Sequence, residues 1–269
     1  MTLAGLQDSN VHIDARALIV GERLGEGSFG VVFAAQYGGQ DAAIKVFKGG
    51  QAASSRLSAE ALCLARLRHA FVVEFLGVCS DPEARDASGA PVGPALLMQR
   101  ARHGSVLDVM RDPERRGMLC GRGDWLQFLS QAASGIDHLH AQSLLHRDVK
   151  AGNVLVTAQA RPLIADFGLA CAAGGGAACG QGTCRYMAPE LFADGAASAR
   201  SDAYSFGGVM WFVGSAAEDP QHRAEPWEGT PSQDVMDFVV AGDRPDWPRK
   251  VSIPKTLERF RQVRLAHCR

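Results

Sequence analysis

The densest group of chemically capable side chains lies in residues 144 to 156, LLHRDVKAGNVLV, between two short apolar stretches. Asp148 can accept a proton from a hydroxyl group, Lys150 can neutralise a phosphoryl group in transfer, and Asn153 offers a neutral oxygen to a divalent cation. The sequence Asp166-Phe-Gly follows an apolar Leu-Ile-Ala strand thirteen residues after Asn153. Asp-Phe-Gly alone is also a common turn sequence, but at this distance from Asp148 it predicts a second ligand for the same Mg²⁺ ion.

Lys45 lies within the apolar run AAIKVF at residues 42 to 47. A buried ammonium group there would cost free energy without an anion close by. We expect Glu60, on the helix that follows, to be that anion, and a lysine paired in this way can hold the α- and β-phosphates of a nucleotide. The alternative is a lysine on an edge strand that points into water, which is the usual place for an isolated lysine.

Residues 25 to 32, GEGSFGVV, form a glycine-rich loop. Missing side chains let backbone N–H groups approach phosphate oxygens. Dinucleotide-binding loops share this glycine spacing, but in them the last glycine opens a helix, whereas Val31 and Val32 continue as a strand. The context favours a hairpin over phosphates, and a tight glycine turn without a ligand remains the alternative.

The elements around these residues change from strands to helices along the chain. β-branched and aromatic residues around glycine turns predict three short antiparallel strands within residues 18 to 47, and apolar spacing predicts a helix from about Ser54 to Leu67. Two more strands are expected at 71 to 77 and 95 to 98, joined by a solvated loop. The remainder is predicted to be mainly helical, most clearly over residues 124 to 140.

Size and composition exclude several classes of protein. The 269 residues are 46% hydrophobic, and 28 basic side chains face 29 acidic ones, which favours one large domain or two packed lobes. There is no polybasic region for nucleic acid, no apolar run of the ~20 residues needed to cross a bilayer, and no signal peptide pattern. We expect a cytoplasmic or nuclear protein, with reduced cysteines, that binds neither nucleic acid nor membrane; its oligomeric state stays open.

Taken together, the motifs resemble the signature set of eukaryotic protein kinases. Over residues 18 to 260 the chain carries, in the order of that family, the glycine-rich loop, the AAIK lysine, HRDVKAGN, DFG, the APE of GTCRYMAPE, and SDAYSFG. The resemblance implies an α+β, bilobal fold with a small antiparallel β-sheet and one helix in the N-lobe, and a mainly helical C-lobe. It implies a single kinase domain over residues 1–269, with the N-lobe at 18–98, the hinge at 99–103 and the C-lobe at 104–269.

The resemblance also implies ATP and Mg²⁺ as cofactors and assigns roles to individual residues. The catalytic residues would be Lys45, Glu60, Asp148 and Lys150, and the metal ligands Asn153 and Asp166. The residues expected to contact the nucleotide belong to the glycine-rich loop, the adenine pocket and the hinge: Leu24, Gly25, Glu26, Gly27, Ser28, Phe29, Gly30, Val31, Val32, Ala43, Lys45, Gln99, Ala101 and Leu155. For the apolar members of this set, ordinary core packing is the alternative.

The expected partner is a protein substrate. Lys150, two residues after Asp148, and Thr183, before CRYMAPE, resemble serine/threonine kinases, and the region before the glycine-rich loop is similar to their tyrosine-kinase-like group. The resemblance therefore implies transfer of the γ-phosphoryl group of ATP to Ser/Thr hydroxyls of a protein. A catalytically silent scaffold with the kinase fold is the alternative, because a fold alone does not fix activity.

The C-terminal region departs from the family pattern. Residues 257 to 269 are interpreted as the penultimate large helix, and the family has a further helix after an arginine that pairs with the glutamate of APE, here Glu190. The C-lobe would then be truncated at its last helix, or an arginine of the tail would replace the missing partner of a buried Glu190. Residues 212 to 225 are also expected to be less regular than the corresponding part of the family.

Overall fold

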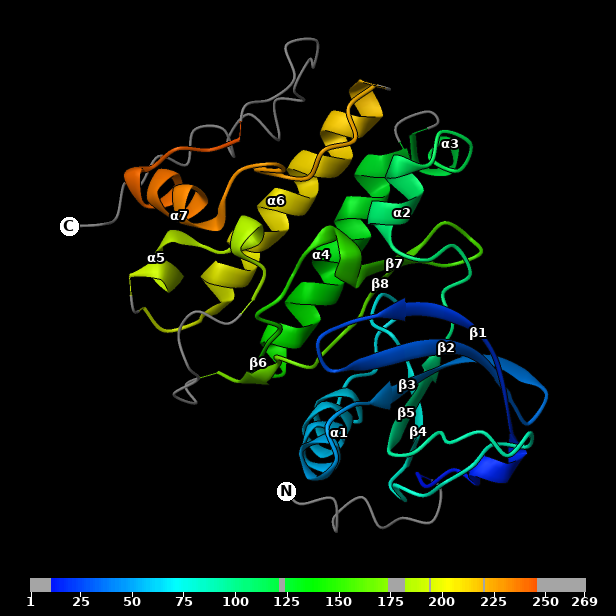
Figure 1. The fold of residues 1–269 in the computed structure, drawn as a ribbon. Coiled ribbons are helices and arrows are strands. Elements are labelled where there is room, and N and C mark those ends of the chain that lie inside the picture. The colour runs from blue at the N-terminus through cyan, green and yellow to red at the C-terminus, as the bar shows by residue number, and fades with distance from the viewer. Residues whose placement is uncertain (1–10, 121–123, 174–181, 194, 220, 246–269) are drawn as a thin grey trace.

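The two lobes expected from the sequence are present (Figure 1). A computed structural model of the protein describes residues 11–120, 124–173, 182–193, 195–219 and 221–245. A five-stranded antiparallel sheet with one helix, α1, is followed by a mainly helical part, which confirms the predicted α+β bilobal fold. The helix expected near residue 257 lies outside the described residues.

The N-lobe sheet has the strand order β1-β2-β3-β5-β4. Its first hairpin is the glycine-rich loop, in which Glu26 pairs with Val31, and its second turns at Gly38 and Gly39, whose φ values of 58° and 78° suit a two-residue turn. The three strands expected before residue 47 are therefore confirmed. The five strands are β1 Leu18–Glu26, β2 Gly30–Tyr37, β3 Gln40–Phe47, β4 Phe75–Cys79 and β5 Ala95–Gln99.

Helix α1 spans Gln51–Leu64, three residues earlier at each end than predicted. Ser54, where the predicted helix begins, lies inside the observed helix, and its carbonyl accepts a hydrogen bond from the Ser58 hydroxyl at 2.7 Å. The first turn instead follows Gly50, which has a φ of 55° and provides no side-chain cap. After Leu64 the α-helix is followed by a tighter turn of the 3₁₀ type, in which the Leu67 N–H donates to the Leu64 carbonyl at 3.0 Å.

The predicted strand at 71 to 77 is divided between the lobes. Only its last residues join the N-lobe sheet as β4. Val73 donates to the Ile164 carbonyl at 2.9 Å, and the Ile164 N–H donates to the Phe71 carbonyl at 2.9 Å. Since Ile164 ends β8 (Pro162–Ile164) in the C-lobe, the apolar residues before β4 connect the two lobes.

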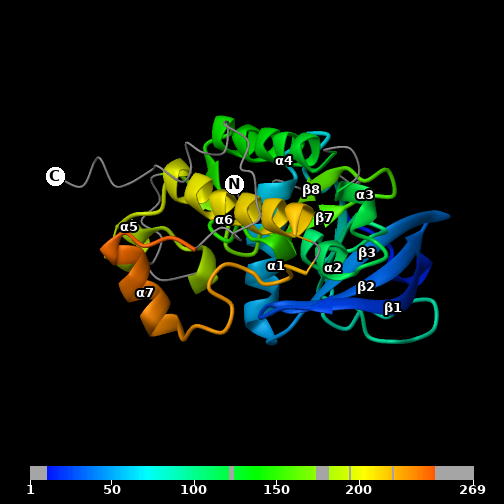
Figure 2. The same cartoon turned by 90° about the horizontal axis from the view of Figure 1, so that it is seen from above.

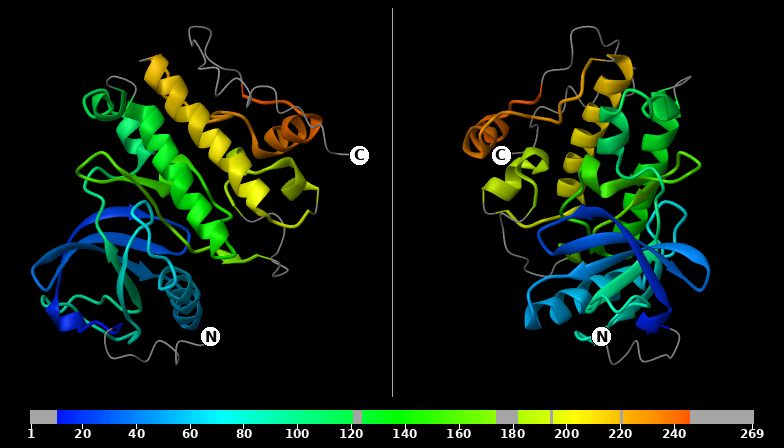
Figure 3. Two further views of the ribbon diagram at one scale, coloured as in Figure 1. Left: turned by 180° about the vertical axis from the view of Figure 1, so that it is seen from behind. Right: turned by 45° about the vertical axis from the view of Figure 1, so that its right-hand side comes forward.

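The C-lobe is built around two long helices, α4 (Asp124–Ala141) and α6 (Ala199–Glu218), which lie side by side (Figures 2 and 3). Helix α4 confirms the prediction over 124 to 140. The expected irregularity over 212 to 225 was wrong for residues 212–218, because α6 continues to Glu218 with Phe212 and Val213 buried, whereas the described residues from 219 to 225 lie outside helices and strands. The other elements are α2 Val106–Arg111, α3 Gly117–Cys120, β6 Leu144–Leu145, β7 Val154–Val156, β9 Cys171–Ala172, α5 Pro189–Phe192 and α7 Ser232–Ala241. Among the helices described here, none has the length and apolar character to cross a bilayer.

A tight contact at Gly135 of α4 gives a test of the lobe junction. A Cβ atom on this residue would lie 2.7 Å from the Phe71 carbonyl oxygen and 3.0 Å from Ile164 Cγ1. We expect Gly135→Ala to lower the free energy of unfolding by about 1–3 kcal/mol, because a backbone atom must move to admit the methyl group. Chemical denaturation measures this change. Gly207→Ala in α6 is the matched control, since a Cβ there meets no atom within 4 Å; equal stability of the two variants would contradict the proposed crowding.

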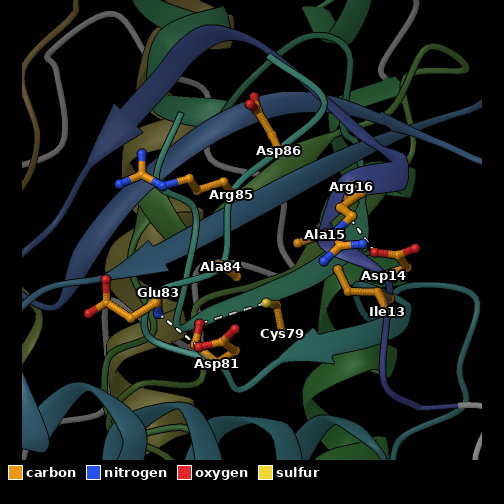
Figure 4. Close-up of a pocket in the computed structure, with 10 residues that line it drawn as sticks. All are labelled: Ile13, Asp14, Ala15, Arg16, Cys79, Asp81, Glu83, Ala84, Arg85 and Asp86. Atoms are coloured by element: carbon orange, nitrogen blue, oxygen red, sulfur yellow. Dashed lines mark hydrogen bonds between the residues drawn. The ribbon is translucent and has the colours of Figure 1, made fainter. Parts of the chain in front are cut away.

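An additional segment extends the sheet beyond β4. The Ile13 N–H donates to the Val78 carbonyl at 2.9 Å, and the Val78 N–H donates to the Val11 carbonyl at 2.8 Å. Between this segment and the loop after β4 lies a hollow of about 550 Å³, lined by Asp14, Cys79 and neighbouring residues (Figure 4). None of the residues predicted for nucleotide or metal binding lines this hollow. The predicted solvated loop is more ordered than expected, since Asp86 is buried and accepts three hydrogen bonds from Ser88 and Ala90.

Candidate active site

Lys45 joins the two lobes through carboxylates. Its Nζ lies 2.9 and 2.7 Å from the two carboxylate oxygens of Glu60 and 2.7 Å from Asp166 Oδ1. The strand β3 places Lys45 opposite Leu96 of β5, and both Lys45 and Glu60 are buried. The structure thus has the expected Lys45–Glu60 pair, and it adds a direct contact with Asp166 that the sequence did not predict.

The ammonium group of Lys45 and the carboxylates of Glu60 and Asp166 shift one another's pKa values. Burial alone would lower the pKa of Lys45, but attraction to Glu60 and Asp166 outweighs burial and raises that pKa above 10.5. Burial raises the pKa of Glu60 above 4.5, and Lys45 opposes this effect. Burial would also raise the pKa of Asp166, but Lys45 outweighs it and holds that pKa below 3.8. Lys45 is therefore a cation and Asp166 an anion at neutral pH.

The carboxylate of Asp148 accepts hydrogen bonds on both oxygens. Oδ2 accepts from Lys150 Nζ at 2.7 Å and from Asn153 Nδ2 at 3.1 Å. Oδ1 accepts from the Thr183 N–H at 3.0 Å and from the Thr183 hydroxyl at 2.7 Å. Lys150 also donates to Thr183 Oγ1 at 2.9 Å. The structure therefore brings together four residues that lie up to 35 positions apart in the sequence.

Asn153 and Asp166 each keep one oxygen that could bind a cation. Asn153 donates through Nδ2 to Asp148 and Asp166 contacts Lys45 through Oδ1, so within the described residues the amide oxygen of Asn153 and Oδ2 of Asp166 accept no hydrogen bond. The Ala165 N–H donates to the Asn153 carbonyl at 2.9 Å, so the two segments are adjacent. No cluster of three His, Cys, Asp or Glu side chains is present among the described residues. One carboxylate and one amide oxygen fit Mg²⁺, which keeps several waters and binds substrate phosphates.

The residues predicted for the adenine pocket lie on β2, β3 and β7 and at the end of β5. Val32 and Leu155 pack against the apolar cluster that contains Ala43 and Met98. Gln99 ends β5, where it pairs with Ala42 of β3, and Ala101 follows two residues later. These positions are compatible with an adenine site between β2, β3, β7 and the hinge.

The glycine-rich loop is formed as predicted in outline, with differences at its edges. The Gly27 N–H donates to the Gly30 carbonyl at 2.9 Å, which closes the hairpin tip. The Glu26 carboxylate contacts Lys48 and Arg23, and its pKa is lowered, first by the hydrogen bond from Lys48. Leu24 is 43% exposed. The Glu26 side chain is thus engaged by two cations, and a role in nucleotide binding would fall to its backbone.

Asp202 supports the loop that carries Asp148, and sequence reasoning assigned it no role. Its carboxylate accepts from the N–H groups of His146 at 2.9 Å and Arg147 at 2.8 Å, and lies 2.9 Å from His140 Nε2. Asp202 is 1% exposed. Asp202 is the acidic residue of the SDAYSFG motif, so the sequence marked its position. The groups that its carboxylate binds could be identified only from the fold.

Asp202 makes an acid-sensitive contribution to stability. Burial would raise its pKa, but hydrogen bonds from His140 and the backbone outweigh burial and lower that pKa below 3.8. An acid with a lowered pKa in the folded state stabilises the fold above its unfolded pKa, and this stability is lost as the pH falls through the folded value. We expect Asp202→Asn to lower the free energy of unfolding at pH 7 by about 3 kcal/mol. Urea unfolding between pH 7 and pH 3 should show a shallower acid dependence for the variant, and parallel curves would contradict this account.

Two residues of the site have left-handed backbone conformations. Arg147 has a φ of 69° and Asp166 a φ of 64°. Residues other than glycine reach this region at a cost of about 1–3 kcal/mol, and such residues cluster at functional sites. Next to these residues, the ring of Phe167 lies 5.1 Å from that of His146, as measured between centroids. Leu64 is buried in the same apolar cluster as Phe167.

Glu190 differs from the expectation. It is partly exposed rather than buried, and in the described part of the chain no basic group lies within 4.0 Å of its carboxylate. A partly exposed carboxylate is hydrated, so it does not require the partner arginine that a buried one would. The arginines near the C-terminus lie outside the described residues.

Comparisons with known proteins agree with this geometry. The sequence matches the family of protein tyrosine and serine/threonine kinases over residues 18–260. It is 30% identical over 234 residues to megakaryocyte-associated tyrosine-protein kinase of Mus musculus, covering 81% of this chain and 44% of that protein. It is 35% identical over 204 residues to receptor-interacting serine/threonine-protein kinase 3 of Rattus norvegicus, covering 71% and 40%. It is 29% identical over 252 residues to mitogen-activated protein kinase kinase kinase 7 of Homo sapiens, covering 91% and 38%.

The chain thus spans less than half the length of these curated relatives. Their names include both a tyrosine kinase and a serine/threonine kinase, so the similarity supports the family without selecting the acceptor residue.

Proposed function

The chain belongs to the protein tyrosine and serine/threonine kinase family, and on this premise we propose that it is an active kinase that transfers the γ-phosphoryl group of ATP to Ser/Thr hydroxyls of a protein substrate. The observation that carries the proposal is the contact of Lys45 with both Glu60 and Asp166. This contact places the N-lobe cation next to the C-lobe carboxylate, as phosphate and metal binding at one nucleotide require.

The residues of the chain would divide the reaction between them. Lys45, held by Glu60, would bind the α- and β-phosphates, and Asp148 would accept the proton of the acceptor hydroxyl as it attacks the γ-phosphorus. Lys150 would offset the negative charge on the transferred group from its position beside Asp148. Asn153 and Asp166 would hold Mg²⁺, which neutralises phosphate charge when it is bound. Catalysis would then depend on positioning and charge compensation rather than on a covalent intermediate.

The surroundings of Asp148 support a serine or threonine acceptor. Thr183 and Lys150 form hydrogen bonds with Asp148 and with each other, so both occupy space beside the proposed base. A short side chain would bring its hydroxyl to Asp148 with the substrate backbone close to Thr183. A tyrosine hydroxyl lies several ångströms farther from its backbone and would require the substrate to bind farther away.

A transfer assay tests the proposal. Purified protein would be incubated with MgCl₂, γ-labelled ATP and three peptide pools that differ only in Ser, Thr or Tyr as the acceptor. We expect labelled phosphoserine and phosphothreonine. Label in tyrosine alone would overturn the acceptor class, and no transfer by protein that still shows a cooperative thermal transition would favour the silent scaffold.

A further inference from the structure

Arg56 connects helix α1 to the tip of the glycine-rich loop. The Arg56 guanidinium carbon lies 5.2 Å from the centroid of the Phe29 ring, within the range of a cation–π contact. Its Nη1 donates to the Lys48 carbonyl at 3.2 Å, in the turn between β3 and α1. One side chain therefore contacts both the loop tip and the turn that leads into its own helix.

The Phe29 ring also lies next to Gly168, in the segment that carries Asp166. A Cβ atom on Gly168 would lie 3.0 Å from Phe29 Cδ2. The backbone of the loop tip is fixed in the same region, because the Lys48 N–H donates to the Phe29 carbonyl at 3.0 Å. Phe29 thus lies between Arg56 of α1 and Gly168, two residues after Asp166.

We propose that Arg56 is a positioning residue that holds the glycine-rich loop closed over the nucleotide through Phe29. The inference rests on the proposed function, because ATP is the ligand that the loop would cover. Arg56 lies four residues before Glu60, so both side chains project from the same side of α1. The position of α1 would therefore set both the Lys45–Glu60 pair and the closure of the loop.

A double-mutant cycle on ATP affinity tests the link. The variants are Arg56→Ala, Phe29→Leu and their combination, and the dissociation constant of ATP with Mg²⁺ is measured by calorimetry. We expect each single change to weaken ATP binding by about two- to fivefold, as for a contact that is partly exposed. The combined variant should bind no more weakly than the weaker single variant, because both remove the same contact.

Conservative and distant variants separate this contact from general effects. Arg56→Lys keeps the positive charge but lacks the planar guanidinium group, so it should bind ATP more weakly than the wild type. Arg68→Ala is the matched control, because Arg68 has a side chain that is 76% exposed and contacts Glu74. Its ATP affinity should equal that of the wild type.

Hydrogen exchange without nucleotide gives a readout that does not depend on ATP. The amides of Gly27 and Lys48, whose hydrogen bonds close the loop tip, should exchange faster in Arg56→Ala than in Arg68→Ala. Three results would each overturn the inference. Amide exchange could be the same in Arg56→Ala and Arg68→Ala, or the double variant could lose ATP affinity by the product of the two single losses. Arg56→Ala could also bind ATP more tightly than the wild type. Wild-type protein that binds ATP but transfers no phosphoryl group would overturn the proposed function alone, while ATP binding absent from folded wild type would overturn both.

Discussion

Replacement of Asp148 by asparagine is expected to lower turnover by a factor of about 10² to 10⁴, because an amide cannot accept the proton of the attacking hydroxyl. ATP affinity should change little, since Asp148 contacts Lys150, Asn153 and Thr183 rather than the lysine expected to bind the phosphates. Initial rates of phosphate transfer at saturating ATP, together with a calorimetric dissociation constant for ATP, measure the two effects separately.

The control for this change is Asp137→Asn, which alters an exposed carboxylate on α4. It should keep the rate of the wild type. A thermal transition recorded for both variants shows whether the loss of hydrogen bonds around residue 148 has disturbed the fold. An Asp148→Asn protein that is folded and as fast as the wild type would remove Asp148 from the proposed role.

Replacement of Lys45 by methionine is expected to abolish measurable transfer and to lower the free energy of unfolding at neutral pH by about 3 kcal/mol, because Glu60 would be left as a buried charge without its cation. The loss should depend on pH. Burial and the nearby Asp166 carboxylate raise the pKa of Glu60, and without Lys45 only the weaker effect of the Phe167 backbone hydrogen bond opposes that rise. An acid whose folded pKa lies above its unfolded value loses stability as the pH rises, so the variant should be more strongly destabilised at pH 8 than at pH 5.

Chemical denaturation of wild type and Lys45→Met at the two pH values measures this difference. The double variant Lys45→Met/Glu60→Leu serves as the control, since it removes both charges and fills the space with apolar groups. It should regain stability without regaining activity. If the double variant were no more stable than Lys45→Met at pH 8, the buried charge of Glu60 would not be the cause of the loss.

The chemistry of the site could be predicted from the sequence because local context constrains it strongly. An ammonium group within AAIKVF needs a buried anion, and this requirement predicts Glu60 as the partner of Lys45. The structure has that pair. The glycine-rich hairpin could be predicted in the same way, since a strand rather than a helix follows its last glycine. In these cases a few neighbouring residues decide the structure.

The parts that could not be predicted depend on contacts between distant segments. The contact of Lys45 with Asp166 joins residues 121 positions apart, and the anchoring of the Asp148 loop depends on Asp202 of α6. The apolar residues before β4 were predicted to continue the same strand. Residues buried against the C-lobe and residues buried in the sheet are both apolar, so the local sequence does not distinguish them. Arg56 carried no sequence signal, since an arginine on a helix usually faces solvent.

The hydrogen bonds that Val11 and Ile13 make with β4 determine where the domain can be trimmed. A fragment beginning at Leu18 would include strands β1 to β9. It would lack Val11 and Ile13, so the N–H and C=O of Val78 would lose their hydrogen-bond partners. Unpaired N–H and C=O groups at the edge of a sheet can form hydrogen bonds with a strand of another chain. We therefore expect such a fragment to self-associate through β4 more readily than a chain that keeps residues 11 to 17.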